Sequence, residues 1–354
     1  MPEERLMAVR KRLDKLSWSK RDRLAILPVL ILSLLLPLGV SRYQASQQVP
    51  AFHYELSEEL RLSFTNVDAV IEQIRHALAA HSSAIRIHYK ASDGYMDEVS
   101  TLVSELMACA MMDAETPTEG DYIRYQYGGY DLSYGHMEDG DSYRYDLVIT
   151  PVYYTDIEQE AYVDERVQEI LDGFGFTEKA ALQGASADAS EGDSEGSTAG
   201  SAAGGRDSVG SAVTDEEKIA AVYDYICSHV SYDSIHKTSL YHLKSTAYGA
   251  LYSGIAGCQG YSVLAYRLLQ ELGIDCRVVT GMAEYEGESE YHAWNIVRLG
   301  DCYYNMDITW DARLGEPVYY LRGESFFTDH SPDEEFLTEA FLQAYPISRT
   351  DYSN

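Results

Sequence analysis

The feature that most constrains this chain is a long stretch, residues 178–213, built almost entirely from small and polar residues. Glycine, serine and alanine dominate it, and large apolar side chains are nearly absent. Such a segment cannot bury enough surface to offset the loss of chain entropy, so we expect a flexible linker. The 354 residues should therefore fold as separate units on either side of it rather than around one core.

The first forty residues are typical of a membrane-directed segment. Residues 1–23 carry eight Lys or Arg against four acids, and residues 24–40 form an uncharged apolar run. This run is short for a span and contains Pro28 and Pro37, so a cleaved signal peptide is the alternative. No small-x-small cleavage site follows, which favours an uncleaved transmembrane signal anchor. The basic flank then predicts a single-pass protein of the cell membrane, with a cytoplasmic N-terminus and with the residues after about 41 in an extracytoplasmic position.

Charge and cysteine usage exclude several functions. A net charge of −30 argues against a nucleic-acid partner, because an acidic surface repels phosphate. The five cysteines form no C-x-x-C pair and no EF-hand loop occurs, so we expect no metal and no cofactor. Cys276 and Cys302 could pair in an exported protein, but unpaired core cysteines are the favoured interpretation.

Residues 45–177 predict a small α+β domain of unknown role. Tyrosines recur at every second position in two of its segments, which would suit a stacking platform for wall sugars, although half-buried hairpin faces are favoured. The expected elements alternate along the chain. They are helices at 66–80, 96–112 and 163–174, and strands at 84–90, 122–134 and 142–154.

The second predicted domain, residues 214–340, begins with a helix start at Thr214 and Glu217, which are spaced as in a capping box. Within it, the segment GCQGYS places Cys258 between two glycines where an apolar helical pattern begins. Backbone N–H groups and the helix dipole stabilise a thiolate at such a position. A lone cysteine there is more often a buried hydrophobe, so the interpretation needs a partner base.

A base is supplied by a predicted hairpin of residues 291–299 and 302–310 around the turn Gly300-Asp301. This turn would pair Leu299 with Cys302 and, counting outward, Trp294 with Asp307 and His292 with Thr309. His292 shares a face with Trp294, so Asp307 becomes its diagonal neighbour. Asp307 could then orient His292, and the second ring nitrogen could accept the thiol proton of Cys258.

Alternatives remain for several residues. Asp311 is the second choice for the carboxylate. Trp294 and Trp310 could line a substrate cleft or simply pack the sheet. The other nine histidines have no predicted partner.

The three ordered motifs GCQGYS, YHAWNIV and YYNMDITWD resemble the transglutaminase-like superfamily core over roughly residues 215–335. The resemblance implies a papain-like α+β fold in which the cysteine-bearing helix packs on an antiparallel sheet. It implies that Cys258 is the nucleophile, His292 the general base and acid, and Asp307 the orienting carboxylate. We place Trp294, Trp310 and Gln259 as candidate substrate-binding residues, although Gln259 follows the nucleophile, unlike the glutamine of papain.

The reaction implied by this resemblance is acyl transfer from an amide or peptide bond through a cysteine thioester. Water as acceptor would give a protease or deamidase, and an amine would give a cross-linking transglutaminase. The expected partner is a protein or peptide substrate, including cell-wall peptide. The alternative is a catalytically silent module of the same fold that binds peptides or assists cell-envelope assembly.

Overall fold

The structure is a computed structural model, and it describes residues 64, 66–91, 96–112, 116–176, 213–234, 242–285 and 287–353. These residues belong to one compact unit, residues 50–354. The predicted anchor at 24–40 and positions 178–212 of the predicted linker lie outside the described residues. Within the described part of the chain, no helix has the length and apolar character needed to cross a membrane.

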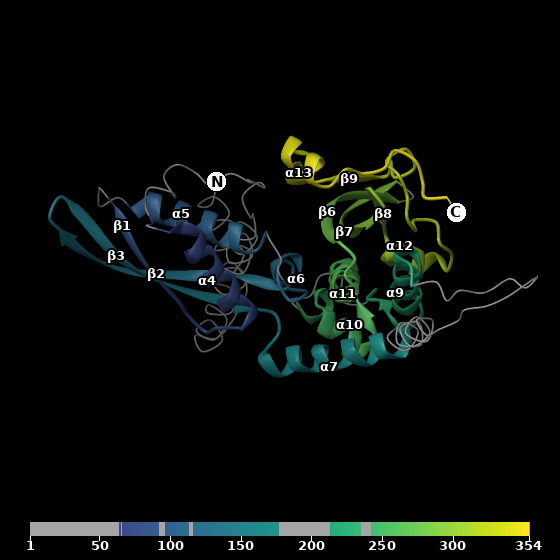
Figure 1. The fold of residues 1–354 in the computed structure, drawn as a ribbon, viewed down its shortest axis with the longest axis horizontal. Helices are drawn as coiled ribbons and strands as arrows, with labels where there is room; N and C mark the ends of the chain where they lie inside the picture. The colour runs from purple at the N-terminus through teal and green to yellow at the C-terminus, as the bar shows by residue number, and fades with distance from the viewer. Residues whose placement is uncertain are drawn as a thin grey trace, which may run out of the picture. The chain divides into compact units, whose positions relative to one another are not determined.

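The described residues begin with a three-stranded antiparallel sheet in the order β1-β3-β2, carrying two helices (Figure 1). Every second residue of β3, such as Tyr145, Leu147 and Ile149, is buried against the helices, while Arg144 and Asp146 face solvent. The predicted α+β character is therefore confirmed. The elements are α4 (Val67–Ala79), β1 (Ile85–Ala91), α5 (Met96–Ala110), β2 (Tyr127–Asp139) and β3 (Ser142–Tyr153).

The start of the first tyrosine-rich strand was predicted wrongly. Residues Asp121–Arg124 form a short helix, α6, and the strand begins only at Tyr127. Asp121 is fully buried and accepts hydrogen bonds from the Arg277 guanidinium and the Val278 amide. These tertiary contacts hold the backbone in a turn that the alternating pattern does not reveal.

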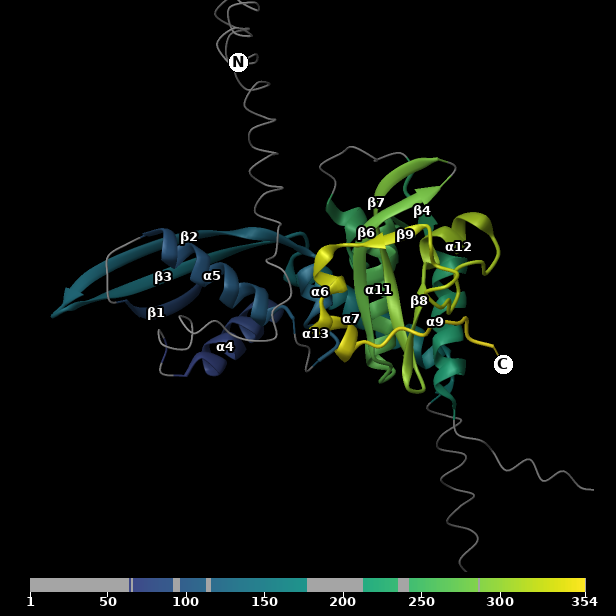
Figure 2. The ribbon, with the colours of Figure 1, turned by 90° about the horizontal axis from the view of Figure 1, so that it is seen from above.

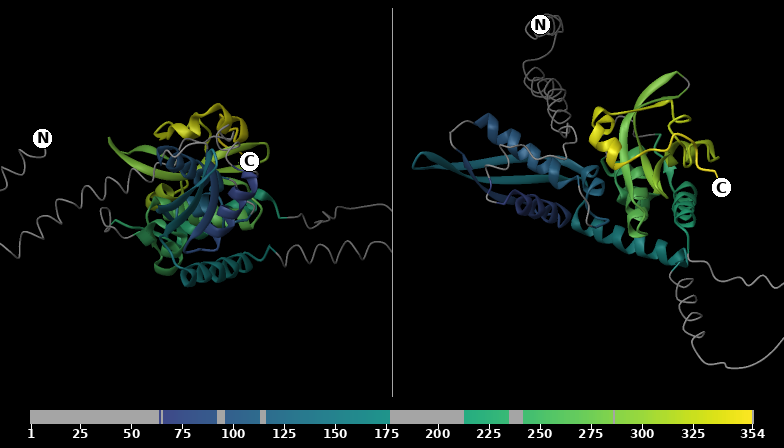
Figure 3. Two further views of the ribbon diagram at one scale, coloured as in Figure 1. Left: turned by 90° about the vertical axis from the view of Figure 1, so that its left-hand side faces the viewer. Right: turned by 45° about the horizontal axis from the view of Figure 1, so that its top comes forward.

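The long helix α7 (Ile157–Gly173) precedes the predicted linker and packs next to α10 (Figures 1 and 3). Its apolar side chains Val163, Val167 and Ile170 share a core with Ile219 and other residues of α9 and α11. Residues on the N-terminal side of the linker therefore complete the core of the cysteine-bearing part.

The remaining elements build a helix-on-sheet core. The sheet is antiparallel with the order β8-β7-β6-β9. The Thr214 capping box is confirmed at the start of α9. The elements are α9 (Asp215–His229), β4 (Ser231–Tyr232), η1 (His242–Ser245), α10 (Ala247–Ser253), β5 (Ile255–Ala256), α11 (Cys258–Glu271), β6 (Cys276–Tyr285), β7 (Glu288–Leu299), β8 (Cys302–Met306), α12 (Ile308–Leu314), β9 (His330–Pro332), η2 (Glu334–Leu337) and α13 (Glu339–Ala344).

This sheet is buried on both faces. On one face, β6 and β7 side chains including Val278 and Val297 pack in the same cluster as α11. On the other face, Val279 and Trp294 pack against aromatic residues of the C-terminal segment, such as Phe327. Figure 2 shows α11 running beside β6, β7 and β8. The expected arrangement, in which the cysteine-bearing helix packs on an antiparallel sheet, is confirmed.

The hairpin register is also confirmed, since Leu299 pairs with Cys302 and Asn295 with Met306. The second strand, however, ends four residues earlier than predicted. Asp307 is the N-cap of α12, with its Oδ1 accepting a hydrogen bond from Trp310 N at 3.1 Å. The predicted pairing of His292 with Thr309 therefore does not form, because Thr309 lies in the helix.

Gly260 in the first turn of α11 shows why this motif needs glycine. A Cβ at this position would lie 2.5 Å from Lys244 O and 2.9 Å from Ala256 Cβ. We expect Gly260→Ala to lower the free energy of unfolding by about 1–3 kcal/mol through overpacking. Gly173→Ala is the control, because nothing lies within 4 Å of its Cβ. Equal urea midpoints for the two variants would contradict this account.

Candidate active site

Cys258 is the first residue of α11, and Gly257 is the N-cap. No side-chain hydrogen bond caps this helix end. The first backbone N–H groups of α11 therefore lie beside the thiol, where they could stabilise an oxyanion. The thiol is partly exposed, as a nucleophile has to be.

His292 lies on β7 and is almost completely buried. Its Nε2 is 2.8 Å from Asp307 Oδ2, which leaves Nδ1 as the free ring nitrogen for the thiol. Burial opposes protonation of the ring, but the Asp307 carboxylate and Cys258 outweigh it and raise the pKa of His292 to about 10. The imidazole therefore interacts with both partners that the sequence predicts.

Asp307 is fully buried and uses both oxygens. Oδ1 caps α12, while Oδ2 accepts hydrogen bonds from His292 and, at 3.2 Å, from His330 Nε2. Burial opposes its ionisation, but His292 and His330 outweigh this and lower the pKa of Asp307 well below its usual range. Asp307 is thus held as a carboxylate in a fixed orientation.

His330, on β9, was missed because a lone histidine has no visible partner in sequence. The structure brings it from 23 residues beyond Asp307 to the same carboxylate oxygen. The available signal was its place within the resembling region, in the aromatic-rich segment that follows the carboxylate motif. Sheet pairing of β6 with both β7 and β9 places the two histidines near one another.

Asp311, the second choice for the carboxylate, has other partners. Its Oδ2 accepts a hydrogen bond from Tyr223 OH at 2.9 Å, and its Oδ1 accepts one from Tyr319 N at 2.8 Å. Burial raises the pKa of Asp311 to about 6. The side chain joins α9 and α12 to the segment that follows, and no hydrogen bond connects it to His292 within the described residues.

The candidate substrate-binding residues are placed in packing positions. Trp294 and Trp310 are 1% and 3% exposed, and both rings contact His330. Gln259 Nε2 donates a hydrogen bond to Tyr125 O. The contacts with His330 and Tyr125 explain how the three side chains support the fold. Their roles in substrate binding stay predictions.

Tyr232 on β4 pairs with Ala256 on β5, two residues before Cys258. Burial raises the pKa of its phenol to about 12, with Cys258 and Glu290 adding to the shift. The Arg313 guanidinium lies 4.8 Å from the centre of its ring. The phenol therefore stays protonated beside Cys258, as a hydrogen-bond donor to a substrate would need to be.

Among the residues that the structure describes, one group could hold a metal ion: the ligand atoms of His292, Asp307 and His330 lie within 4.8 Å of one another. Both Nε2 atoms already hydrogen-bond to Asp307 Oδ2. A metal ion would have to replace those bonds, so metal binding and an intact triad exclude each other. The expectation of no metal stays a prediction.

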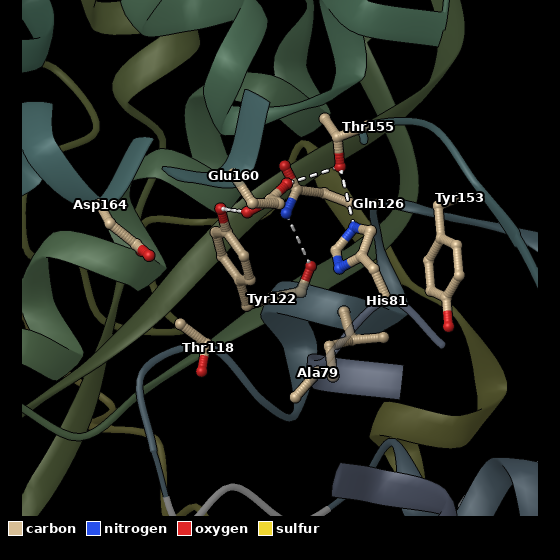
Figure 4. A pocket seen from close by; sticks show the side chains of 10 residues that line it. Ala79, His81, Thr118, Tyr122, Gln126, Tyr153, Thr155, Glu160 and Asp164 are labelled. Atoms are coloured by element: carbon tan, nitrogen blue, oxygen red, sulfur yellow. Dashed lines mark hydrogen bonds between the residues drawn. The ribbon is translucent and has the colours of Figure 1, made fainter. Parts of the chain in front are cut away.

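A pocket of about 190 Å³ lies apart from these residues (Figure 4). Its polar groups hydrogen-bond to each other: Glu160 accepts from Tyr122 OH at 2.6 Å and from Thr155 Oγ1 at 2.5 Å. His81 is 3.3 Å from Thr155 Oγ1. None of the predicted site residues lines this pocket, and its contacts connect α7 to the segment before it.

The three site residues lie within a segment that matches a known protein family. Residues 205–308, which include Cys258, His292 and Asp307, match the model of the transglutaminase-like superfamily. Kyphoscoliosis peptidase of Homo sapiens is 28% identical over 152 residues, and that of Mus musculus 27%. Each alignment covers 36% of this chain and 22% of the relative, so the chain spans about a fifth of those proteins.

Two solved structures share limited similarity. A TGase is 16% identical with a TM-score of 0.30, covering 50% of this chain and 44% of that one. A candidate cysteine protease from Cytophaga hutchinsonii is 13% identical with a TM-score of 0.26, covering 52% and 65%. On the family match, this chain contains a transglutaminase-like superfamily domain, distantly similar to kyphoscoliosis peptidase.

Proposed function

We propose that this protein is a cysteine acyl-transfer enzyme that cleaves amide bonds in proteins or peptides, with Cys258 as nucleophile, His292 as general base and acid, and Asp307 as the orienting carboxylate. The observation that carries the proposal is the 2.8 Å contact between His292 Nε2 and Asp307 Oδ2, together with a thiol that raises the pKa of the same imidazole. The position of Cys258 at the start of α11, where no side chain caps the helix, supports the proposal further.

The proposed reaction has two steps. The Cys258 thiolate attacks the amide carbon, and the oxyanion accepts the Cys258 backbone N–H and a second donor, for which the protonated Tyr232 phenol is a candidate. The C–N bond then breaks, and the His292 imidazolium gives its proton to the leaving amine. In the second step, neutral His292 removes a proton from the acceptor, which attacks the thioester and releases Cys258.

We propose water as the acceptor and a peptide bond as the bond that is cleaved, which together make the enzyme a peptidase. The two curated relatives support this choice, since both are named as peptidases. Incubating the full chain with wall peptides and glutamine-containing proteins in the presence of a fluorescent amine tests it. New amino termini are expected; amine incorporation would instead identify a transferase, and ammonia release without either a deamidase.

A silent binding module is the competing function. It has no need of a hydrogen-bonded cysteine, histidine and aspartate, so the geometry favours an enzyme. If none of the three products appears, while the peptides bind equally to the chain and to its Cys258→Ser variant, the binding module becomes the better account.

The cellular location belongs to the proposal as well. We propose that residues 24–40 anchor the chain in the cell membrane and that the thiol site lies outside, because the basic flank precedes the apolar run. Protease added to intact cells should then remove the described residues. Their survival until the cells are opened would contradict this orientation.

The pH profile should report the histidine. The pKa of His292 is raised from its ordinary value of 6.5 to about 10, so its protonated form persists below pH 10 and is lost above it. Because the leaving amine needs that proton, we expect kcat/KM to fall as pH rises through about 10. An alkaline limb near pH 6–7, the ordinary range of histidine, would contradict the coupling to Asp307.

A further inference from the structure

His330 lies between two carboxylates. Its Nε2 is 3.2 Å from Asp307 Oδ2, and its Nδ1 is 2.7 Å from Asp329 Oδ1. The ring is completely buried, whereas the Asp329 side chain is 32% exposed. The orientation of the Asp329 carboxylate is fixed in turn, because its Oδ2 accepts a hydrogen bond from Tyr319 OH at 2.6 Å.

This arrangement defines what His330 can do chemically. A carboxylate only accepts hydrogen bonds, so each ring nitrogen, Nε2 toward Asp307 and Nδ1 toward Asp329, can form its hydrogen bond only as the donor. Asp329 fixes the rotation of the ring, which keeps Nε2 directed at Oδ2. The same oxygen accepts from His292, so Asp307 is held between two imidazoles as well as by the α12 backbone.

We propose that His330 is a positioning residue of the thiol site, which Asp329 orients and which donates its Nε2 hydrogen to Asp307 so that this carboxylate stays aligned with His292. This inference rests on the proposed function and deepens it. The connected groups run from Cys258 through His292, Asp307 and His330 to Asp329. Histidine at position 330 is then needed for its ring nitrogens and not only for its shape.

Packing is the competing explanation, because the ring stacks on Phe327 at 3.9 Å and contacts Trp310 at 4.5 Å between centroids. Three substitutions separate the two roles. His330→Phe keeps an aromatic ring and removes both hydrogen bonds. His330→Gln places an amide N–H where Nε2 stood, and His330→Asn places one where Nδ1 stood, facing Asp329 only.

The readout is the rate at which iodoacetamide alkylates Cys258 at pH 7 in the full chain, followed by peptide mass spectrometry. We expect His330→Phe and His330→Asn to lower this rate about tenfold to hundredfold, the range expected when a hydrogen bond to a charged group is lost. His330→Gln should restore it to within about threefold of the wild type. His88→Gln, at an exposed position on β1, is the matched control and should leave the rate unchanged.

The outcomes separate this inference from the proposed function. Two results would overturn the role of His330 while leaving the proposed function intact. In the first, Cys258 is alkylated as fast in His330→Phe as in the wild type. In the second, it is alkylated as slowly in His330→Gln as in His330→Asn. A wild-type Cys258 no faster than the other cysteines would overturn the proposed function and this inference with it. If the Phe variant loses its thermal unfolding transition, the Gln and Asn variants decide the question.

Discussion

Asp307→Asn is expected to lower kcat about 10³- to 10⁴-fold and to leave the fold intact, as happens when the carboxylate of a catalytic triad becomes an amide. Asparagine is also a good N-cap, so its Oδ1 can still accept from Trp310 N. Its NH₂ group would then face the Nε2 atoms of His292 and His330, where hydrogen-bond donors meet donors. His292 loses its orientation and the charge that raises its pKa.

Asp311→Asn is the matched control for this variant. It removes a buried carboxylate four residues away in the sequence, yet its partners are Tyr223 and Tyr319. We expect a loss of stability with kcat close to that of the wild type. A larger loss of kcat in Asp311→Asn than in Asp307→Asn would mean that the triad carboxylate has been assigned to the wrong aspartate.

Arg277→Ala is expected to cost about 3–5 kcal/mol in the free energy of unfolding, because it leaves a buried carboxylate without its counter-ion. Arg277 donates two hydrogen bonds to Asp121, of 2.7 Å from Nε and 2.9 Å from Nη2, and a third from Nη1 to Tyr345 OH. Both members of the ion pair are almost completely buried. Urea unfolding followed by tyrosine and tryptophan fluorescence measures the effect.

The matched control is Arg144→Ala, which breaks an exposed ion pair with Asp139 and should change stability little. Equal effects of the two substitutions would show that the Asp121 pair is not a structural link. The link matters for experiment, because deleting residues 45–177 would remove Asp121 and the apolar face of α7. Such a deletion would damage the core beside Cys258, so any loss of activity would not identify the role of the 45–177 domain.

Local signals in the sequence were sufficient for much of the fold. The Gly-Asp turn defined the β7–β8 register, and the capping pattern placed Thr214 at a helix start. Both depend on neighbouring residues. The helix start at Cys258 follows equally from glycines and apolar spacing within one segment.

Long-range contacts explain what the sequence did not reveal. β8 ends at Met306 because Asp307 caps the next helix, which an alternating apolar pattern conceals. His330 reaches Asp307 only because β9 pairs with β6, and no spacing rule predicts that pairing. Asp121 belongs to a helical turn because a buried arginine 156 residues later binds it.

The most direct test of the central claim is the alkylation rate of all five cysteines of the full chain at pH 7, compared between the wild type and His292→Ala. None of the five cysteines, all of which the structure describes, forms a disulfide, so four serve as internal references. We predict that Cys258 reacts faster than the other four and that His292→Ala removes this advantage. A Cys258 that reacts no faster than the others, with no change in His292→Ala, would contradict the account.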